Sequence, residues 1–102
     1  MYDRILKRMR EKIRTRQYVM TLHGEEEMND DGLTIFDIER GVLTGQIIER
    51  QKDHQTGEWK YLIQGKTIAD DDVVVVSKLS PTEKLVIITV YLEKNMESNH
   101  DL

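Results

Sequence analysis

Residues 73–92, VVVVSKLSPTEKLVIITVYL, decide the fold of this chain. The first four residues are an apolar β-branched run, which is typical of a buried central strand. Pro81, the only proline, lies in the polar turn that follows, and residues 84–92 return as a second strand. Strands joined by so short a connection pair antiparallel, so this stretch predicts the centre of an antiparallel sheet.

The last predicted strand has two distinct faces, because successive side chains point to opposite sides of a sheet. One face is wholly apolar and is expected to meet the helices: Val86, Ile88, Val90 and Leu92. The other face ends in two hydroxyl groups: Leu85, Ile87, Thr89 and Tyr91. This alternation predicts a sheet with one covered face and one face turned to solvent.

Two further strands are predicted before this stretch, over residues 46–52 and 58–64. The polar segment 53–57, Asp-His-Gln-Thr-Gly, joins them as a hairpin loop. On the return strand Trp59, Tyr61 and Ile63 share one side, and Lys60, Leu62 and Gln64 share the other. Residues 46–92 are therefore expected to form a meander of four strands.

The N-terminal part of the chain predicts helices. Apolar residues at helical spacing predict a helix over residues 2–15, and β-favouring residues predict a short strand over 17–22. Residues 24–30 predict a short helix, and Thr34 and Asp37 resemble the capping box of another helix that ends near Gly41 and Gly45. The fold class is α+β, with the N-terminal helices packed on one face of an antiparallel four- to five-stranded sheet.

Composition bounds the possible functions. The chain has 102 residues, 38% of them hydrophobic, which suits one domain over residues 1–93 followed by a polar tail over 94–102. Its lack of cysteine excludes disulfides, thiolate metal sites and a cysteine nucleophile. No long apolar run or signal peptide is present, so we expect a cytoplasmic protein without a membrane segment. No motif predicts a cofactor.

Charge is unevenly distributed along the chain. Residues 1–16 carry seven basic and two acidic side chains, whereas residues 23–39 carry seven acidic and no basic ones. The basic helix has two interpretations: a solvated face whose long side chains cover the core, or a handle for RNA or an acidic protein. Arg4, Arg8 and Lys12, four residues apart, are the expected partner-binding residues.

The predicted solvent-facing side of the sheet is a candidate phosphodiester site. Arg50 and Lys52 lie two residues apart on one strand and point the same way, and Lys60 and Lys66 follow on the next. Cations of this kind balance phosphate charge, and the hydroxyls of Thr89 and Tyr91 donate hydrogen bonds. The alternative is that all six are ordinary solvated positions of a half-exposed sheet.

His23 is the candidate proton-transfer residue, because it lies beside predicted structure rather than in a loop or tail. Glu26 and Glu27 follow three and four residues on, within reach of His23 on a helix. The pair either orients a general base or is a plain helix-terminus interaction. His54 is expected in the hairpin loop and His100 in the tail. No metal site is expected, because His23-Gly-Glu-Glu-Glu lacks the second histidine of a zinc helix.

Several segments, taken in order, resemble the bacterial domain of unknown function family 4258. They are residues 16–19 (RQYV), His23 at the start of a helix, residues 33–49 (LTIFDIERGVLTGQIIE), residues 61–65 (YLIQG), residues 73–76 and residues 87–93 (IITVYLE). The resemblance implies the small nuclease fold of RelE, barnase and the colicin-type ribonucleases. It further implies an MqsR-type toxin partnered by a zinc-finger antitoxin of the YgiT type, with His23, Thr89 and Tyr91 at the family's recurrent polar positions.

Three hypotheses follow. The first is a type II toxin, a metal-independent endoribonuclease cleaving mRNA, with His23, Tyr91, Thr89 and Lys60 as catalytic residues. Arg50, Lys52 and Lys66 would then bind the RNA substrate. The second is a non-catalytic protein-binding module that docks an acidic partner on the basic helix. The third is a scaffold domain that forms a homodimer through a sheet edge.

Overall fold

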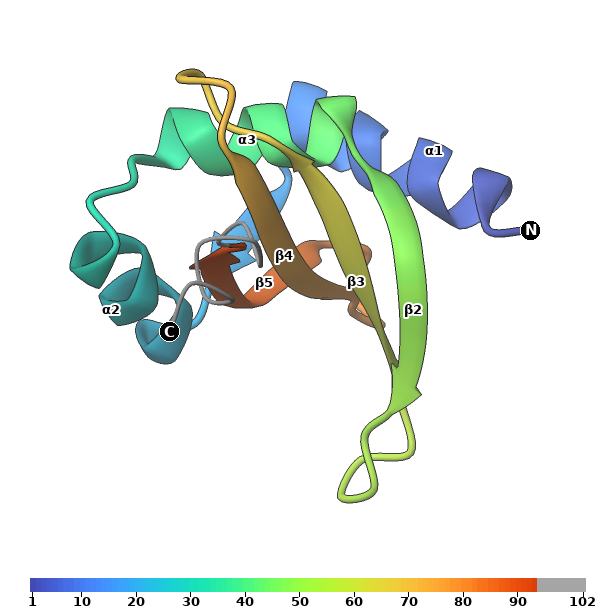
Figure 1. Ribbon diagram of the computed structural model, residues 1–102. Helices are drawn as coiled ribbons and strands as arrows, with labels where there is room; N and C mark the ends of the chain where they lie inside the picture. Colours follow the sequence, from blue (N-terminus) through green and yellow to red (C-terminus); the bar gives the residue numbers. More distant parts are fainter. Residues whose placement is uncertain (94–102) are drawn as a thin grey trace, which may run out of the picture.

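Three helices and one mixed sheet make up residues 1–93, the part of the chain that the computed structural model describes (Figure 1). The elements follow in the order α1 (Asp3–Arg14), β1 (Tyr18–Met20), α2 (Leu22–Asp30), α3 (Ile35–Thr44), β2 (Gln46–Lys52), β3 (Trp59–Lys66), β4 (Asp72–Leu79) and β5 (Leu85–Leu92). The predicted α+β class and the predicted order of elements are confirmed. The predicted tail, with His100, lies outside the described residues.

The sheet has the strand order β1-β5-β4-β3-β2. The last four strands form the expected antiparallel meander. The expectation of a purely antiparallel sheet is wrong for β1, which joins the edge of β5 in parallel, with Tyr18 opposite Leu85 and Met20 opposite Ile87. The sheet is therefore mixed but mostly antiparallel.

Helices α1 and α3 cover one face of the sheet, which we call the inner face (Figure 1). They bury apolar residues at helical spacing, as the sequence predicts: Leu6, Met9 and Ile13 of α1, and Ile38 and Val42 of α3. Strands β3, β4 and β5 contribute the other side of this core: Ile63, Val73, Val75, Leu85, Ile87 and Val90. Thr34 and Asp37 form the predicted capping box at the start of α3.

Strand β5 does not alternate as the sequence suggests. Its pairing with β4 slips between Val76 and Ser77, so that Val76 lies opposite Thr89 and Ser77 opposite Ile87. Ile88 is therefore an extra residue, a β-bulge, and the two halves of β5 alternate out of phase. Val90 and Leu92 face the helices as expected, but Leu85 and Ile87 join them there in place of Val86 and Ile88.

Helix α3 approaches β3 closely, because glycines stand at the contact. A methyl group added at Gly65 of β3 would lie 2.0 Å from the backbone oxygen of Gly41 on α3. A methyl group added at Gly41 would lie 2.8 Å from a methyl carbon of Val73. Only hydrogen fits between the two backbones at Gly65, so this position requires glycine.

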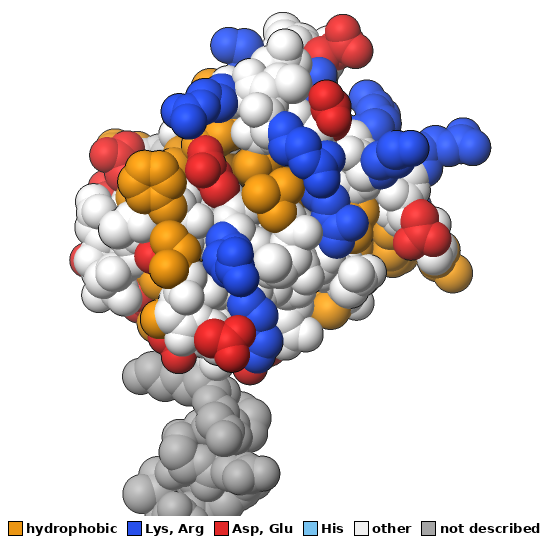
Figure 2. Space-filling model, turned by 90° about the horizontal axis from the view of Figure 1, so that it is seen from above, with side chains coloured by type: hydrophobic (Ala, Val, Ile, Leu, Met, Phe, Trp, Pro, Cys, Tyr) orange, Lys and Arg blue, Asp and Glu red, His pale blue; other side chains and the backbone are white. Residues whose placement is uncertain are grey.

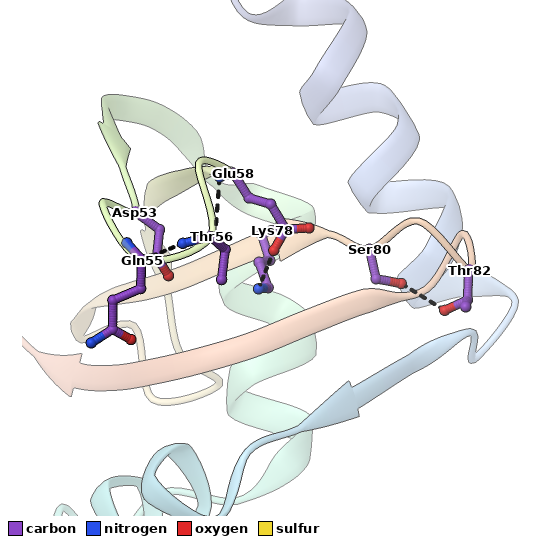
Figure 3. A network of polar contacts seen from close by, with 7 residues as sticks. All are labelled: Asp53, Gln55, Thr56, Glu58, Lys78, Ser80 and Thr82. Atoms are coloured by element: carbon purple, nitrogen blue, oxygen red, sulfur yellow. Dashed lines mark hydrogen bonds and ion pairs between the residues drawn. The ribbon is translucent and has the colours of Figure 1, made fainter.

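The hairpin loop between β2 and β3 is held by its own polar groups (Figure 3). The carboxylate of Asp53 accepts hydrogen bonds from the backbone N–H groups of Gln55 and Thr56, at 2.9 and 3.4 Å. Both hydrogen bonds lower the pKa of Asp53, and the bond from Gln55 has the larger effect. The Lys78 ammonium forms an ion pair of 2.7 Å with Glu58, joining the base of the loop to β4.

Within residues 1–93, none of the helices is both long and apolar enough to cross a membrane.

Candidate functional site at the β5 edge

The face of the sheet turned away from α1 and α3, which we call the outer face, carries Thr89 and Tyr91. Thr89 lies opposite Val76, and Tyr91 lies opposite Val74. A small apolar cluster of Leu62, Val74 and Val76 lies next to them on the same face. Beyond the bulge at Ile88, both hydroxyl side chains therefore point to the outer side, as the sequence predicts.

Tyr91 keeps its proton more firmly than an ordinary tyrosine. Partial burial is the main cause that raises its pKa, and the negative charges of Glu93 and Glu49 raise it further. Tyr91 as a whole residue is 37% exposed, so its side chain is only partly covered. Tyr91 is therefore an O–H donor throughout the physiological pH range.

Helix α2 fills the edge of β5 beyond the point where β1 ends. The helix begins at Leu22, two residues earlier than predicted, because Thr21 caps it by accepting a hydrogen bond from the N–H of Gly24. Thr21 also donates its hydroxyl proton to the backbone oxygen of Ile88 at 2.8 Å. Gly24 faces the strand so closely that a methyl group there would meet the backbone oxygens of Ile87 and Ile88 at 3.2 and 3.1 Å.

The direction of His23 follows from the helix geometry. Gly24 faces the edge of β5, and Met28 packs against the core on the inner side. Since each residue advances about 100° around a helix, His23 and Glu27 lie on the opposite flank, toward the outer face. The Nε2 atom of His23 lies 3.5 Å from a carboxylate oxygen of Glu27. The imidazole thus shares one side of the molecule with Thr89 and Tyr91.

The lysines of the outer face lie further away. Gln64 on β3 lies level with Tyr91 on β5, with β4 between them, so the two are about 10 Å apart across the sheet. Lys66 lies two residues beyond Gln64, which adds about 7 Å along the strand between Lys66 and Tyr91. Lys60 is four residues from Gln64 in the other direction, so about 14 Å along the sheet separates it from Tyr91. Lys66 forms an ion pair of 2.7 Å with Asp72, which raises its pKa.

Arg50 and Lys52 lie on the inner face, so the structure does not bring them together with Thr89 and Tyr91. Strand β2 has its own bulge, because Ile47 pairs with Ile63 but Glu49 pairs with Leu62. The extra residue, Ile48, turns Arg50 to the side of Tyr61. The guanidinium carbon of Arg50 lies 4.0 Å above the ring centre of Trp59 and 5.9 Å from that of Tyr2. Neither this bulge nor the aromatic cluster could be predicted from the sequence.

The three predicted partner-binding residues form one stripe of α1. Figure 2, which looks down on the helices, shows Lys and Arg side chains gathered toward the side where α1 lies. The ion pairs of residues 1–93 are Arg14–Glu11, Lys66–Asp72 and Lys78–Glu58, beside the contact of His23 with Glu27. Arg4, Arg8 and Lys12 take part in none of these ion pairs.

Two cavities open beside α1 on the inner side. One, of about 320 Å³, is lined by Met1, Tyr2, Asp3, Leu6, Gln46 and Ile47. The other, of about 240 Å³, is lined by Ile5, Arg8, Glu58, Trp59, Tyr61 and Leu79. His23, Thr89 and Tyr91 line neither cavity. Across residues 1–93, acidic and histidine side chains do not gather in a group of three or more that could hold a metal ion.

No curated protein and no solved structure matches this chain. The family described as a domain of unknown function (DUF4258) matches residues 20–92, a stretch that runs from the end of β1 to the end of β5 and includes His23, Thr89 and Tyr91. The chain therefore belongs to the DUF4258 family.

Proposed function

We propose that this chain is a metal-independent endoribonuclease that cleaves mRNA, the toxin of a type II toxin–antitoxin pair. The observation that carries the proposal is that Gly24 of α2 faces the β5 strand whose outer side carries Thr89 and Tyr91. From the helix geometry we infer that His23, with Glu27 as its carboxylate neighbour, is turned toward the same side. The family resemblance implies an MqsR-type toxin, and the proposed substrate class and antitoxin follow from this implication.

The chemistry needs only side chains of this kind. The ribose 2′-hydroxyl oxygen attacks the adjacent phosphorus, and the 5′-oxygen of the next nucleotide leaves. One group takes the 2′ proton and another returns a proton to the leaving oxygen, which produces a 2′,3′-cyclic phosphate and a 5′-hydroxyl end. Histidine exchanges protons readily near neutral pH, so His23 takes the proton-transfer role, with Glu27 orienting its ring.

Tyr91 and Thr89 act as donors to the phosphate oxygens, where negative charge develops in the transition state. The raised pKa of Tyr91 suits this role, because a phenolate could not donate a proton or a hydrogen bond. Lys66, and Lys60 further away, supply cations along the same outer face. In this proposal Arg50 and Lys52 do not contact the scissile phosphate, because they lie on the other side of the sheet.

The first prediction concerns catalysis. Inducible expression of the wild-type chain in a bacterium should arrest growth, and the purified protein should cleave RNA in the presence of a chelator, leaving cyclic phosphate ends. His23→Ala should lower the cleavage rate about 100-fold or more, as expected for loss of a general acid or base. Tyr91→Phe, which removes only the hydroxyl group, should also slow cleavage.

His54→Ala is the matched control, since His54 is an exposed histidine in the hairpin loop. This variant should cleave RNA as the wild type does. Loss of cleavage with the chelator, or wild-type cleavage by both His23→Ala and Tyr91→Phe, would rule out the proposed mechanism. A neighbouring reading frame that encodes a paired-cysteine zinc finger would support the proposed antitoxin.

A further inference from the structure

The smaller of the two cavities lies between α1 and the β2–β3 hairpin, on the inner side of the sheet. We call it the α1–hairpin cleft, and its lining is Ile5, Arg8, Glu58, Trp59, Tyr61 and Leu79. Four of its six lining residues are aliphatic or aromatic, and its volume of about 240 Å³ suits one or two side chains and is smaller than the usual pocket for a small molecule. The cleft therefore suits an anchor residue of a peptide.

Cations without an acidic partner surround the cleft. Arg8 lines it, Arg50 stacks on Trp59 at 4.0 Å, and the Lys52 ammonium lies 5.8 Å from the same ring centre. None of these three forms an ion pair within residues 1–93. Glu58 is the one acid in the lining, and Lys78 neutralises it at 2.7 Å (Figure 3). The cleft thus attracts negative charge.

The stacking of Arg50 favours a carboxylate over a nucleic acid base. The guanidinium carbon of Arg50 lies 4.0 Å from the ring centre of Trp59, a residue that is 42% exposed, so this face of the ring is not free to stack on a base. A stacked guanidinium still presents its N–H groups at its edge, where they can bind a carboxylate with two parallel hydrogen bonds. Contact with the rings of Trp59 and Tyr2 also restricts Arg50 before any ligand arrives.

We propose that the α1–hairpin cleft is a docking site for an acidic linear peptide from a protein partner. One apolar side chain of the peptide fills the cavity over Ile5, Tyr61 and Leu79. Carboxylates on either side of this anchor bind Arg8 and Arg50. The site is on the opposite face of the sheet from Thr89 and Tyr91, so it is separate from the proposed nuclease site and does not depend on it.

The experiment is a selection of short random peptides displayed on phage against the purified full chain. Enriched peptides should combine an apolar residue with at least two Asp or Glu residues. A synthetic copy of the most enriched peptide should change the emission of Trp59, the only tryptophan in the chain, which therefore reports on the cleft directly. Arg50→Ala should weaken binding about tenfold or more.

Arg40→Ala is the matched control, because Arg40 is an exposed arginine on α3, away from the cleft lining. It should bind the peptide as the wild type does, and circular dichroism should show that both variants fold. Failure to enrich any peptide, enrichment of peptides without acids, or full binding by Arg50→Ala would overturn the proposal. A short oligouridine RNA that quenches Trp59 in the wild type but not in Arg50→Ala would instead identify a nucleic acid site and overturn it too.

Discussion

Tyr18 shows how a single residue of β1 joins the sheet to the helices. Its hydroxyl donates a hydrogen bond of 2.5 Å to the carboxylate of Glu39 on α3. Partial burial, followed by the hydrogen bond and the negative charge of Glu39, raises the pKa of Tyr18 to about 12. The folded state therefore favours the protonated form of the Tyr18 side chain.

This contact predicts how stability depends on pH. The folded-state pKa lies above the ordinary tyrosine value of about 10, so the stabilisation is fully present below pH 10. The unfolded chain loses the Tyr18 proton first, and the stabilisation therefore disappears as the pH rises from 10 toward 12. Tyr18→Phe should cost about 1 to 2 kcal/mol at pH 7 through loss of the hydrogen bond.

Urea unfolding of the wild type and Tyr18→Phe at pH 7, 10 and 11.5 checks this prediction. The difference in unfolding free energy should narrow above pH 10, since the variant has no proton to lose at this position. A difference that is constant from pH 7 to pH 11.5 would contradict the raised pKa.

At the residue scale, the sequence predicted part of the candidate site. His23, Thr89 and Tyr91 could be named as candidates because the first lies in a polar stretch next to a helix and the others alternate on a recognisable strand, and their roles stay predictions. Arg50 was assigned to the wrong side of the sheet, because strict alternation from Ile47 places it away from the core. The bulge at Ile48 depends on pairing with β3, which local sequence does not encode.

Helix α3 and strand β3 approach backbone to backbone where Gly65 lies against Gly41. Gly65→Ala should force the two backbones apart and destabilise the protein by about 3 kcal/mol, since the added methyl group meets backbone rather than a flexible side chain. Gly57→Ala is the matched control. It has a positive φ of 76° but open space around it, so it should cost only about 1 kcal/mol.

Chemical unfolding followed by Trp59 fluorescence measures both glycine variants. Equal losses would contradict the prediction that the close approach of α3 to β3 determines the effect at Gly65.

The order and type of the elements could be predicted because helical and strand periodicities are local. The capping box of Thr34 and Asp37 was likewise visible in the sequence. The edge position of β1 could not be predicted, because Tyr18, Val19 and Met20 pair with residues more than sixty positions away. The prediction of which β5 side chains face the helices was partly wrong for the same reason, since the bulge at Ile88 arises from pairing with Val76 and Ser77.

The family match covers residues 20–92, yet the core of the molecule extends beyond it. Helix α1 buries Leu6, Met9 and Ile13, which are 4%, 0% and 3% exposed. Truncation of one such side chain to alanine typically costs about 2 to 5 kcal/mol, and a whole domain is stabilised by only about 5 to 15 kcal/mol. The matched stretch therefore needs α1 to complete its core.

Residues 17–102 expressed without α1 should fail to unfold cooperatively with heat or urea. The control is the full chain with Arg4, Lys7 and Arg14 replaced by alanine, which removes exposed charge from the same helix and should preserve cooperative unfolding. A sharp two-state transition for the truncated chain, seen by circular dichroism, would contradict this prediction.

Because of the bulge at Ile88, the number of residues in β5 decides which side chains face the helices, as much as their identities do. Deletion of this one residue would restore regular alternation, and either Leu85 and Ile87 or Thr89 and Tyr91 would then change sides. A homologue one residue shorter at this point would carry either its tyrosine on the inner face or its counterparts of Leu85 and Ile87 on the outer face, even if all other residues were identical. An alignment that places a gap near Ile88 would pair residues that face opposite sides of the sheet. A functional role should therefore not be transferred between such residues.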